Sequence, residues 1–189
     1  LNDSLYNTGV INNEGTILMV TGQVVNGGIY NGFEPEQMSA LDKFLLAIEN
    51  AEGDVHVNEA IVLEDNLRIS IPGALCFDEG SALVVSDGAT LTLDCPVSFF
   101  GSELTVEEGG TLISNQNLSL AAWNGDRNCS SSATINGDCI SNGQIWMVGC
   151  SEMTVNGYLR TNAEVHVGFD GGASLKINGI MDCFGYLNL

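Results

Sequence analysis

The chain has 189 residues, of which 44% are apolar and 7% aromatic, so it is long enough for one domain with a buried core. Five Lys and Arg stand against 24 Asp and Glu, and the formal net charge is −19. A field of that sign repels phosphate groups and anionic lipid, and no apolar run approaches the roughly 20 residues that span a bilayer. We therefore expect neither nucleic acid as a partner nor insertion into a membrane.

Residues 1–33 are predicted to form a short Asn-Gly-rich β segment. Turn-forming groups punctuate it at Asn7-Thr8-Gly9, Asn13-Glu14-Gly15, Val25-Asn26-Gly27 and Tyr30-Asn31-Gly32. Asn-Gly punctuation is typical of tight turns between very short strands. Two interpretations stay open: the last coils of a preceding solenoid, or a layer of strands that packs on the main one.

Residues 34–52 are predicted to contain one amphipathic helix. Pro35 suits a first helical turn, and Glu34 and Glu36 suit the positive end of the helix dipole. The apolar residues fall on one face at a period of 3.6, and they are Met38, Leu41, Phe44, Leu45 and Ile48. We expect this helix to cap the open end of a solenoid, where it would cover unpaired strand edges. The alternative is a helix packed along the solenoid's side.

Residues 53–189 are predicted to form that solenoid, in rungs of about 21 residues and continuous with the rest of the chain. Short apolar alternations of period 2 indicate strands with one buried face. They are Leu83/Val85, Leu91/Leu93, Leu104/Val106, Met153/Val155, Val165/Val167, Leu175/Ile177 and Leu187/Leu189.

Two columns of turn residues support the repeat. An Asn or Asp returns at steps of 20 to 22, at Asp94, Asn115, Asn136, Asn156 and Asn178. A second column runs through Asp87, Glu108, Cys129, Cys150 and Gly171 at steps of 21. Asn tolerates sharp bends and hydrogen-bonds its own kind, so we expect the members of the Asn column to lie above one another in successive coils.

On these columns and alternations the chain resembles the parallel β-helix proteins of the pectate-lyase-like superfamily and the solenoid segments of bacterial surface proteins, over roughly residues 35 to 189. The resemblance implies an all-β fold, a single-stranded right-handed parallel β-helix with one N-terminal capping α-helix. The stretch from Asn117 to Ser132 departs most from the repeat, and we expect it to bulge as a loop.

Six cysteines lack the close pairing of a zinc site. Cys129 and Cys150 lie one repeat apart, where stacked coils hold Cα atoms about 4.8 Å from each other, within disulfide range. This pair is the predicted disulfide, although buried free thiols remain the alternative. Cys76 and Cys95 also lie close to one repeat apart, whereas Cys139 and Cys183 are two coils apart and too distant.

No catalytic set is visible, and we predict neither a cofactor nor a metal site. Asp87, Glu107 and Glu108 occupy successive turns and could share a calcium ion, but acidic turns also serve simply to solvate a corner. Alternation turns His56 and His166 outward, too far apart for a metal site. An aromatic platform for sugars is conceivable from Trp123, Trp146, Phe99 and Phe100, but core filling is the favoured interpretation.

The leading hypothesis is a non-catalytic structural or adhesive segment of an extracellular or cell-surface bacterial protein, with glycans or host and cell-surface proteins as partners. The alternative is a carbohydrate-active enzyme, a polysaccharide lyase or glycoside hydrolase of the pectate-lyase-like type. Acidic, Gly-rich composition with few Lys favours a location outside the cell. The chain starts without a leader and stops within a repeat, so we expect it to be part of a longer protein.

Overall fold

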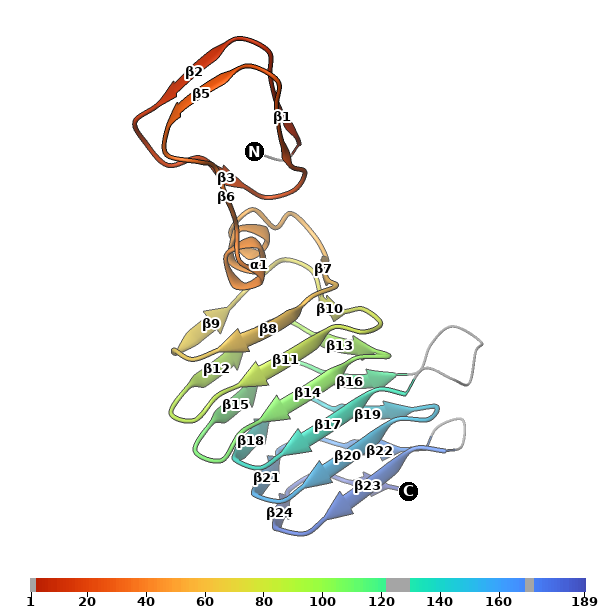
Figure 1. Ribbon diagram of the computed structural model, residues 1–189. Coiled ribbons are helices and arrows are strands. Elements are labelled where there is room, and N and C mark those ends of the chain that lie inside the picture. Colours follow the sequence, from red (N-terminus) through yellow and green to blue (C-terminus); the bar gives the residue numbers. More distant parts are fainter. Residues whose placement is uncertain (1–2, 122–129, 169–171) are drawn as a thin grey trace. The chain divides into compact units, whose positions relative to one another are not determined.

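The computed structural model describes residues 3–121, 130–168 and 172–189 (Figure 1). The fold is an all-β parallel solenoid with coils of about 21 residues and one short helix. The chain divides into two compact units, Leu1–Leu46 and Ala47–Leu189, which we describe separately. No helix in the described ranges has the length and apolar character to cross a bilayer.

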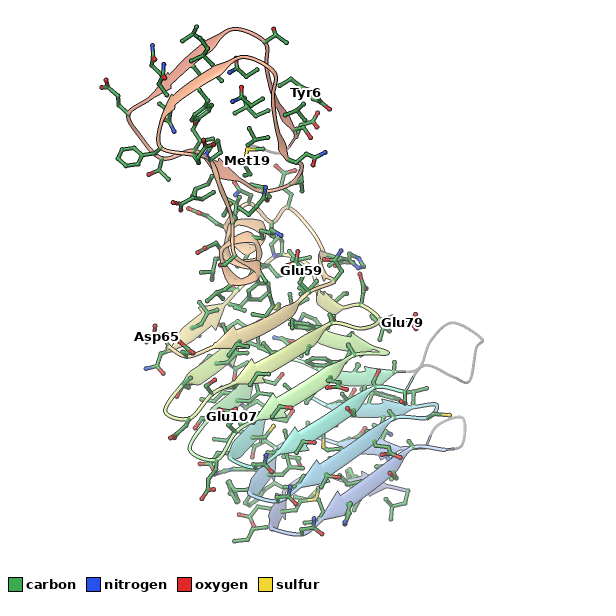
Figure 2. The ribbon with its side chains drawn as sticks, viewed as in Figure 1. Tyr6, Met19, Glu59, Asp65, Glu79 and Glu107 are labelled. Carbon is green, nitrogen blue, oxygen red and sulfur yellow. The ribbon has the colours of Figure 1, made fainter. Side chains whose placement is uncertain are left out.

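The N-terminal unit consists of two stacked coils. Its three strand pairs are all parallel: β1 (Leu5–Asn7) with β4 (Val24–Asn26), β2 (Val10–Asn13) with β5 (Ile29–Gly32), and β3 (Leu18–Met19) with β6 (Glu36–Gln37). Met19 is buried inside this unit, whereas Tyr6 is 71% exposed (Figure 2). The pairing is that of a two-coil solenoid, and both interpretations of how this segment relates to the rest of a solenoid stay predictions.

Asn-x-Gly corners hold these coils together. Asn7 Oδ1 accepts a hydrogen bond from the Gly9 amide over 3.0 Å, which closes the turn. The Asn7 Nδ2 group donates to Asn26 Oδ1 over 2.8 Å, at the matching corner of the next coil. One side chain therefore satisfies both the local turn and the stack, which explains why Asn precedes Gly so often here.

The helix α1 (Ala40–Glu49) is shorter than the predicted 34–52 segment. Ser39 precedes it, and its hydroxyl accepts from the Asp42 amide over 3.0 Å and donates to the Asp42 carboxylate over 2.7 Å. This reciprocal cap fixes the start of the helix at Ala40. Residues Glu36 and Gln37 instead form β6, because they pair with the first coil. The predicted capping of the solenoid by this helix stays a prediction.

The main unit has three parallel sheets, and each strand pairs with its equivalent in the next coil. The seven-stranded sheet contains β7 (Val55–Val57), β10 (Leu75–Phe77), β13 (Val97–Phe100), β16 (Leu118–Ala121), β19 (Ile145–Val148), β22 (Val165–Val167) and β25 (Leu187–Asn188). One six-stranded sheet contains β8 (Ala60–Leu63), β11 (Ala82–Val85), β14 (Glu103–Val106), β17 (Ser132–Ile135), β20 (Glu152–Val155) and β23 (Ser174–Ile177). The other contains β9 (Leu67–Ile69), β12 (Thr90–Leu93), β15 (Thr111–Ser114), β18 (Asp138–Ser141), β21 (Tyr158–Thr161) and β24 (Ile180–Cys183).

This architecture confirms the predicted parallel β-helix and is consistent with its right-handed sense. Alternate residues of each strand face the interior, where equivalent side chains stack. Leu83 pairs with Leu104 in the next coil, and each is 1% exposed. Phe77 and Phe99 stack with ring centroids 4.8 Å apart. In the last coil the inward Ile177 and Leu187 are 37% and 44% exposed, because no later coil among the described residues covers them.

The predicted single Asn column is wrong: its members belong to two separate ladders. One ladder runs from Asp94 through Asn115 and Asn142 to Asn162, at spacings of 21, 27 and 20 residues, with hydrogen bonds of 2.6–2.7 Å. The coil after Asn115 is longer than the others, so a step of 21 from Asn115 reaches a different corner. Asn136 therefore does not lie above Asn115.

The second ladder occupies that other corner. Asn156 donates to Asn136 over 2.8 Å, and Asn178 donates to Asn156 over 2.7 Å. The stacking principle behind the prediction is confirmed for neighbours within each ladder, while the assignment of Asn136 to the first ladder is not.

The second predicted column also mixes corners. Asp87 and Glu108 follow β11 and β14 at one corner, where the Gly88 amide donates to the Gly109 carbonyl over 3.2 Å. Cys150 precedes β20, so it lies at the opposite end of the same sheet. Cys129 and Gly171 lie outside the described residues.

The predicted loop over 117–132 is also too long. Leu118–Ala121 is the strand β16, in register with Val97–Phe100, and Ser132 begins β17. The apolar alternation of Leu118 and Leu120, both fully buried, continues the stack into this stretch. Residues 122–129, including Trp123, lie outside the described part of the chain.

Candidate functional site

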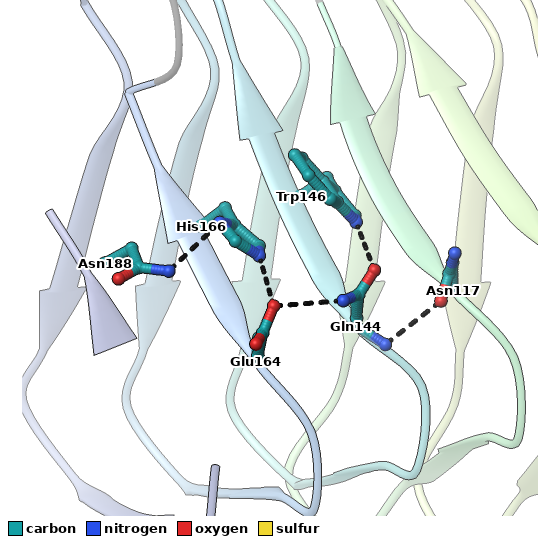
Figure 3. Close-up of polar contacts among 6 residues, drawn as sticks. All are labelled: Asn117, Gln144, Trp146, Glu164, His166 and Asn188. Carbon is teal, nitrogen blue, oxygen red and sulfur yellow. Dashed lines mark hydrogen bonds and ion pairs between the residues drawn. The ribbon is translucent and has the colours of Figure 1, made fainter. Parts of the chain in front are cut away.

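The outer face of the seven-stranded sheet carries a polar and aromatic cluster near the last coils (Figure 3). We call it the Trp146 patch, and its members are Asn117, Gln144, Trp146, Glu164, His166 and Asn188. Three of them stand at the corners that precede the strands, and the other three stand on β19, β22 and β25.

Strand register builds the aromatic part of the patch. Ile145 and Met147 are both buried, so alternation turns Trp146 between them outward. Trp146 on β19 is in register with His166 on β22. Their rings stack with centroids 4.1 Å apart and an interplanar angle of 13°. Neighbouring strands lie about 4.8 Å apart, so the stack follows from the register itself.

A chain of hydrogen bonds joins the two rings to the corner residues. The Trp146 Nε1 group donates to Gln144 Oε1 over 3.1 Å. Gln144 Nε2 donates in turn to Glu164 Oε2 over 3.1 Å. The Gln144 amide donates to Asn117 Oδ1 over 3.1 Å, which secures the corner to the coil before it. Both aromatic and amide planes are thereby held in fixed orientations.

The same network holds both ring nitrogens of His166. Its Nε2 atom lies 2.9 Å from Glu164 Oε2. Nδ1 lies 3.3 Å from Asn188 Nδ2. With these neighbours the His166 side chain is only 16% exposed, whereas sequence alternation alone predicted a fully outward histidine.

Glu164 retains capacity to bind. Its Oε2 atom takes both donors, from Gln144 and His166. Among the described residues Oε1 has no hydrogen-bond partner, and the side chain is 40% exposed. An open hollow of about 360 Å³ lies beside the imidazole, lined by His166, Val167, Gly168, Asn188 and Leu189. The patch thus combines an oriented acceptor, an amide and an aromatic wall beside a concave surface.

An acidic corner forms a second open hollow, of about 550 Å³, lined by Asp87, Glu107, Glu108, Asn136 and Asn156. The structure therefore brings the three carboxylates of the calcium hypothesis together. Glu107 Oε2 accepts from the Asp87 amide over 3.2 Å, so it is engaged with the turn. Within the described ranges, no group of three His, Cys, Asp or Glu side chains is placed to hold a metal ion.

The predicted Cys129–Cys150 disulfide involves a residue outside the described ones, so it stays a prediction. Cys150 itself is half-buried at the corner before β20. Cys76 and Cys95 are buried free thiols, and burial is the main cause that raises the pKa of each. The thiol of Cys139 is enclosed in the core, and burial raises its pKa to about 12.

The aromatic residues named from the sequence do not form one platform. Phe99 is fully buried against Phe77, in agreement with core filling. Trp146 instead pairs with His166, a contact that sequence reasoning missed. His56 is exposed at the far end of the same sheet, where Nδ1 lies 3.2 Å from the Asp78 carboxylate. The sequence carried one signal for the contact between Trp146 and His166. They are 20 residues apart, which is also the spacing between Asn136 and Asn156, two residues that contact each other in neighbouring coils.

The fold and this outer face define a parallel β-solenoid protein with a polar and aromatic patch on one sheet. Comparison with models of known families, with curated protein sequences and with solved structures gave no match.

Proposed function

We propose that the chain is a non-catalytic structural and adhesive segment of an extracellular or cell-surface bacterial protein, in which the solenoid is a rigid spacer that presents one face to glycans or protein partners. The observation that carries the proposal is the Trp146 patch. Its stacked rings and oriented polar groups lie on the outer face of the seven-stranded sheet, outside the buried interior of the solenoid.

The use of the other side chains supports the spacer role. Most interior columns are apolar, and the corners are tied from coil to coil by ladders such as Asp94, Asn115 and Asn142. A solenoid is stabilised by contacts between neighbouring repeats, so its length can carry a binding face away from an attachment point. The charge of −19 disfavours nucleic acid as the partner.

A screen on polysaccharides tests the proposal against the enzymatic alternative. The purified chain is incubated with acidic and neutral polysaccharides, with and without calcium, and both retention and product release are measured. We expect retention of the chain on at least one polysaccharide or cell-surface protein preparation, without new reducing ends or unsaturated products. Product formation that is abolished by Asp87→Ala or Glu108→Ala would overturn the adhesive proposal in favour of a carbohydrate-active enzyme.

A further inference from the structure

The Asn-Gly corners of the main unit differ in how the Gly amide is held. Within the described residues of this unit, Asn is followed by Gly at Asn136, Asn142, Asn156 and Asn178. We propose that Asn142 is a site of spontaneous deamidation in the folded chain and that the fold protects the other three. The inference goes beyond the proposed adhesive function and does not depend on it.

Deamidation at an Asn-Gly pair is a reaction between neighbouring groups. The amide nitrogen of Gly attacks Cγ of the preceding Asn, and a new C–N bond forms. Nδ2 then leaves as ammonia, with the proton that the Gly nitrogen gives up, and a cyclic succinimide remains. Water opens this ring at either carbonyl carbon and produces Asp or isoaspartate. The reaction therefore requires a Gly amide that is free to turn toward Cγ.

At three of the four corners the Gly amide is bonded to the preceding coil. Each donates to a carbonyl oxygen over 3.0–3.2 Å, and the pairs are Gly137 with Val106, Gly157 with Ile135, and Gly179 with Val155. Attack on Cγ at these corners must first break a hydrogen bond between coils.

The corner at Asn142 lacks this contact. The Gly143 amide has no hydrogen-bond partner among the residues that the structure describes. The amides on either side of it are both engaged. Asn142 donates to the Ser114 carbonyl over 2.7 Å, and Gln144 donates to Asn117 Oδ1 over 3.1 Å. Of the four corners, the attacking nitrogen is therefore free at this one.

Asn156 is a matched comparison for Asn142 within the same molecule. Both side chains are exposed, and each both donates and accepts within a ladder. The ladder neighbours are Asn115 and Asn162 for Asn142, and Asn136 and Asn178 for Asn156. At both positions a hydrogen bond to Oδ1 polarises the Cγ carbonyl that is attacked. The hydrogen bond of the following Gly amide is what distinguishes the two sites.

Modification of Asn142 would open its ladder. Nδ2 of Asn142 donates to Asn115 Oδ1 over 2.7 Å, whereas a carboxylate in its place can only accept. Two acceptors would then face each other between the coils. The isoaspartate form also adds a methylene group to the main chain at this corner. We therefore expect the modified chain to be less stable than the fresh one.

Peptide mapping of the full chain by mass spectrometry tests the site. One sample is kept folded in warm buffer at pH 8, and a second is kept in guanidinium chloride as the unfolded reference. Relative to that reference, we expect folded Asn142 to react within about tenfold of its unfolded rate and Asn156 to be slowed at least about a hundredfold, because it reacts only when its corner opens locally. Equal folded rates at Asn142 and Asn156, or no product at Asn142, would overturn the assignment.

A pair of variants tests the effect on the ladder. Asn142→Asp reproduces one product and is expected to unfold at a lower urea concentration than the wild type. Asn66→Asp makes the same change of charge at an exposed side chain whose Oδ1 accepts from the Thr90 amide over 2.8 Å, a contact that a carboxylate keeps. This control is expected to unfold close to the wild type. Equal midpoints for the two variants would refute the opening of the ladder, and neither experiment bears on adhesion, which the polysaccharide screen tests separately.

Discussion

Asn115 donates a hydrogen bond from Nδ2 to Oδ1 of Asp94, one coil earlier in the chain, over 2.7 Å. Asn142 repeats the same contact on Asn115, and Asn162 repeats it on Asn142. Each inner member both donates and accepts along the solenoid axis, so removal of one member leaves a gap with two unsatisfied neighbours.

The first prediction concerns this ladder. Asn142→Ala is expected to lower the free energy of unfolding by about 1 to 2 kcal/mol, because it removes two side-chain hydrogen bonds between coils. Urea denaturation followed by circular dichroism measures the change. Glu108→Ala, at a solvated corner, serves as the control and should leave the midpoint almost unchanged. Equal midpoints for both variants would mean that the ladder does not contribute to stability.

The second prediction concerns pH. The hydrogen bond from Arg68, followed by that from Asn115, holds the pKa of Asp94 below its ordinary value of 3.8. A carboxyl whose pKa falls on folding stabilises the folded state above that ordinary value and ceases to do so as the pH falls through its folded pKa. Asp94→Asn should therefore destabilise the chain at pH 6 and differ less from the wild type near pH 3.

Chemical denaturation at both pH values checks that dependence. In an Arg68→Gln background the effect of Asp94→Asn should shrink at pH 6, since the main cause of the shift is gone. A difference between Asp94→Asn and the wild type that stays constant from pH 6 to pH 3 would contradict the assignment.

The third prediction compares adjacent phenylalanines. Phe99 is fully buried and stacks on Phe77, whereas Phe100 points outward and is half-buried. We expect Phe99→Ala to cost about 3 to 5 kcal/mol through lost burial and a cavity, and Phe100→Ala to cost clearly less. Thermal and urea unfolding of the two variants measure the contrast. The reverse order would mean that the strand faces the other way.

The fourth prediction concerns close approach at a corner. A Cβ atom on Gly157 would lie 2.2 Å from the carbonyl oxygen of Gly137 in the preceding coil. Gly157→Ala must therefore separate two coils, and we expect a cost of about 2 kcal/mol or more. A Cβ on Gly53 meets no atom within 4 Å, so Gly53→Ala is the matched control and should be tolerated. Comparable unfolding midpoints for the two variants would be evidence against the stacking of Gly157 on Gly137.

The fifth prediction concerns thiols. Because burial raises the pKa of Cys139 to about 12, its thiol stays protonated at pH 8 and should resist iodoacetamide in the folded chain. Cys183 is exposed and should be labelled. Peptide mapping by mass spectrometry reads both, and the same map tests the Cys129–Cys150 disulfide. Finding Cys129 and Cys150 alkylated without reduction would refute that bond.

Much of the fold could be predicted from the sequence because a solenoid repeats its signals. The apolar alternation at Leu83 and Val85 indicates a strand and the face of it that is buried. Its return at Leu104 and Val106 indicates the length of the repeat. A fixed step of 21 failed at Asn136, because the coil between Asn115 and Asn142 spans 27 residues. A fixed step in sequence identifies residues that stack in neighbouring coils only while every coil has the same length. After one longer coil, the same step reaches a residue at a different corner.

The Trp146 patch was missed for a related reason. Alternation does place Trp146 and His166 outward, but their contact depends on the register of β19 against β22, which follows only when the local coil length is known. The hydrogen bonds through Gln144 and Glu164 depend further on side-chain rotamers at the corners. Helix α1 differed from prediction because strand pairing of Glu36 prevailed over the helical preference around Pro35.

The long coil between Asn115 and Asn142 has a practical meaning for modification of this molecule. The strands on either side of the extra residues keep their pairing, since Leu118 still aligns with Ile145 and Val106 with Ile135. A coil can therefore be lengthened between its strands while the strands keep their pairing with the neighbouring coils. Foreign peptides, affinity tags or epitopes inserted in this coil should be displayed at a fixed position along the solenoid axis without loss of strand pairing in the neighbouring coils.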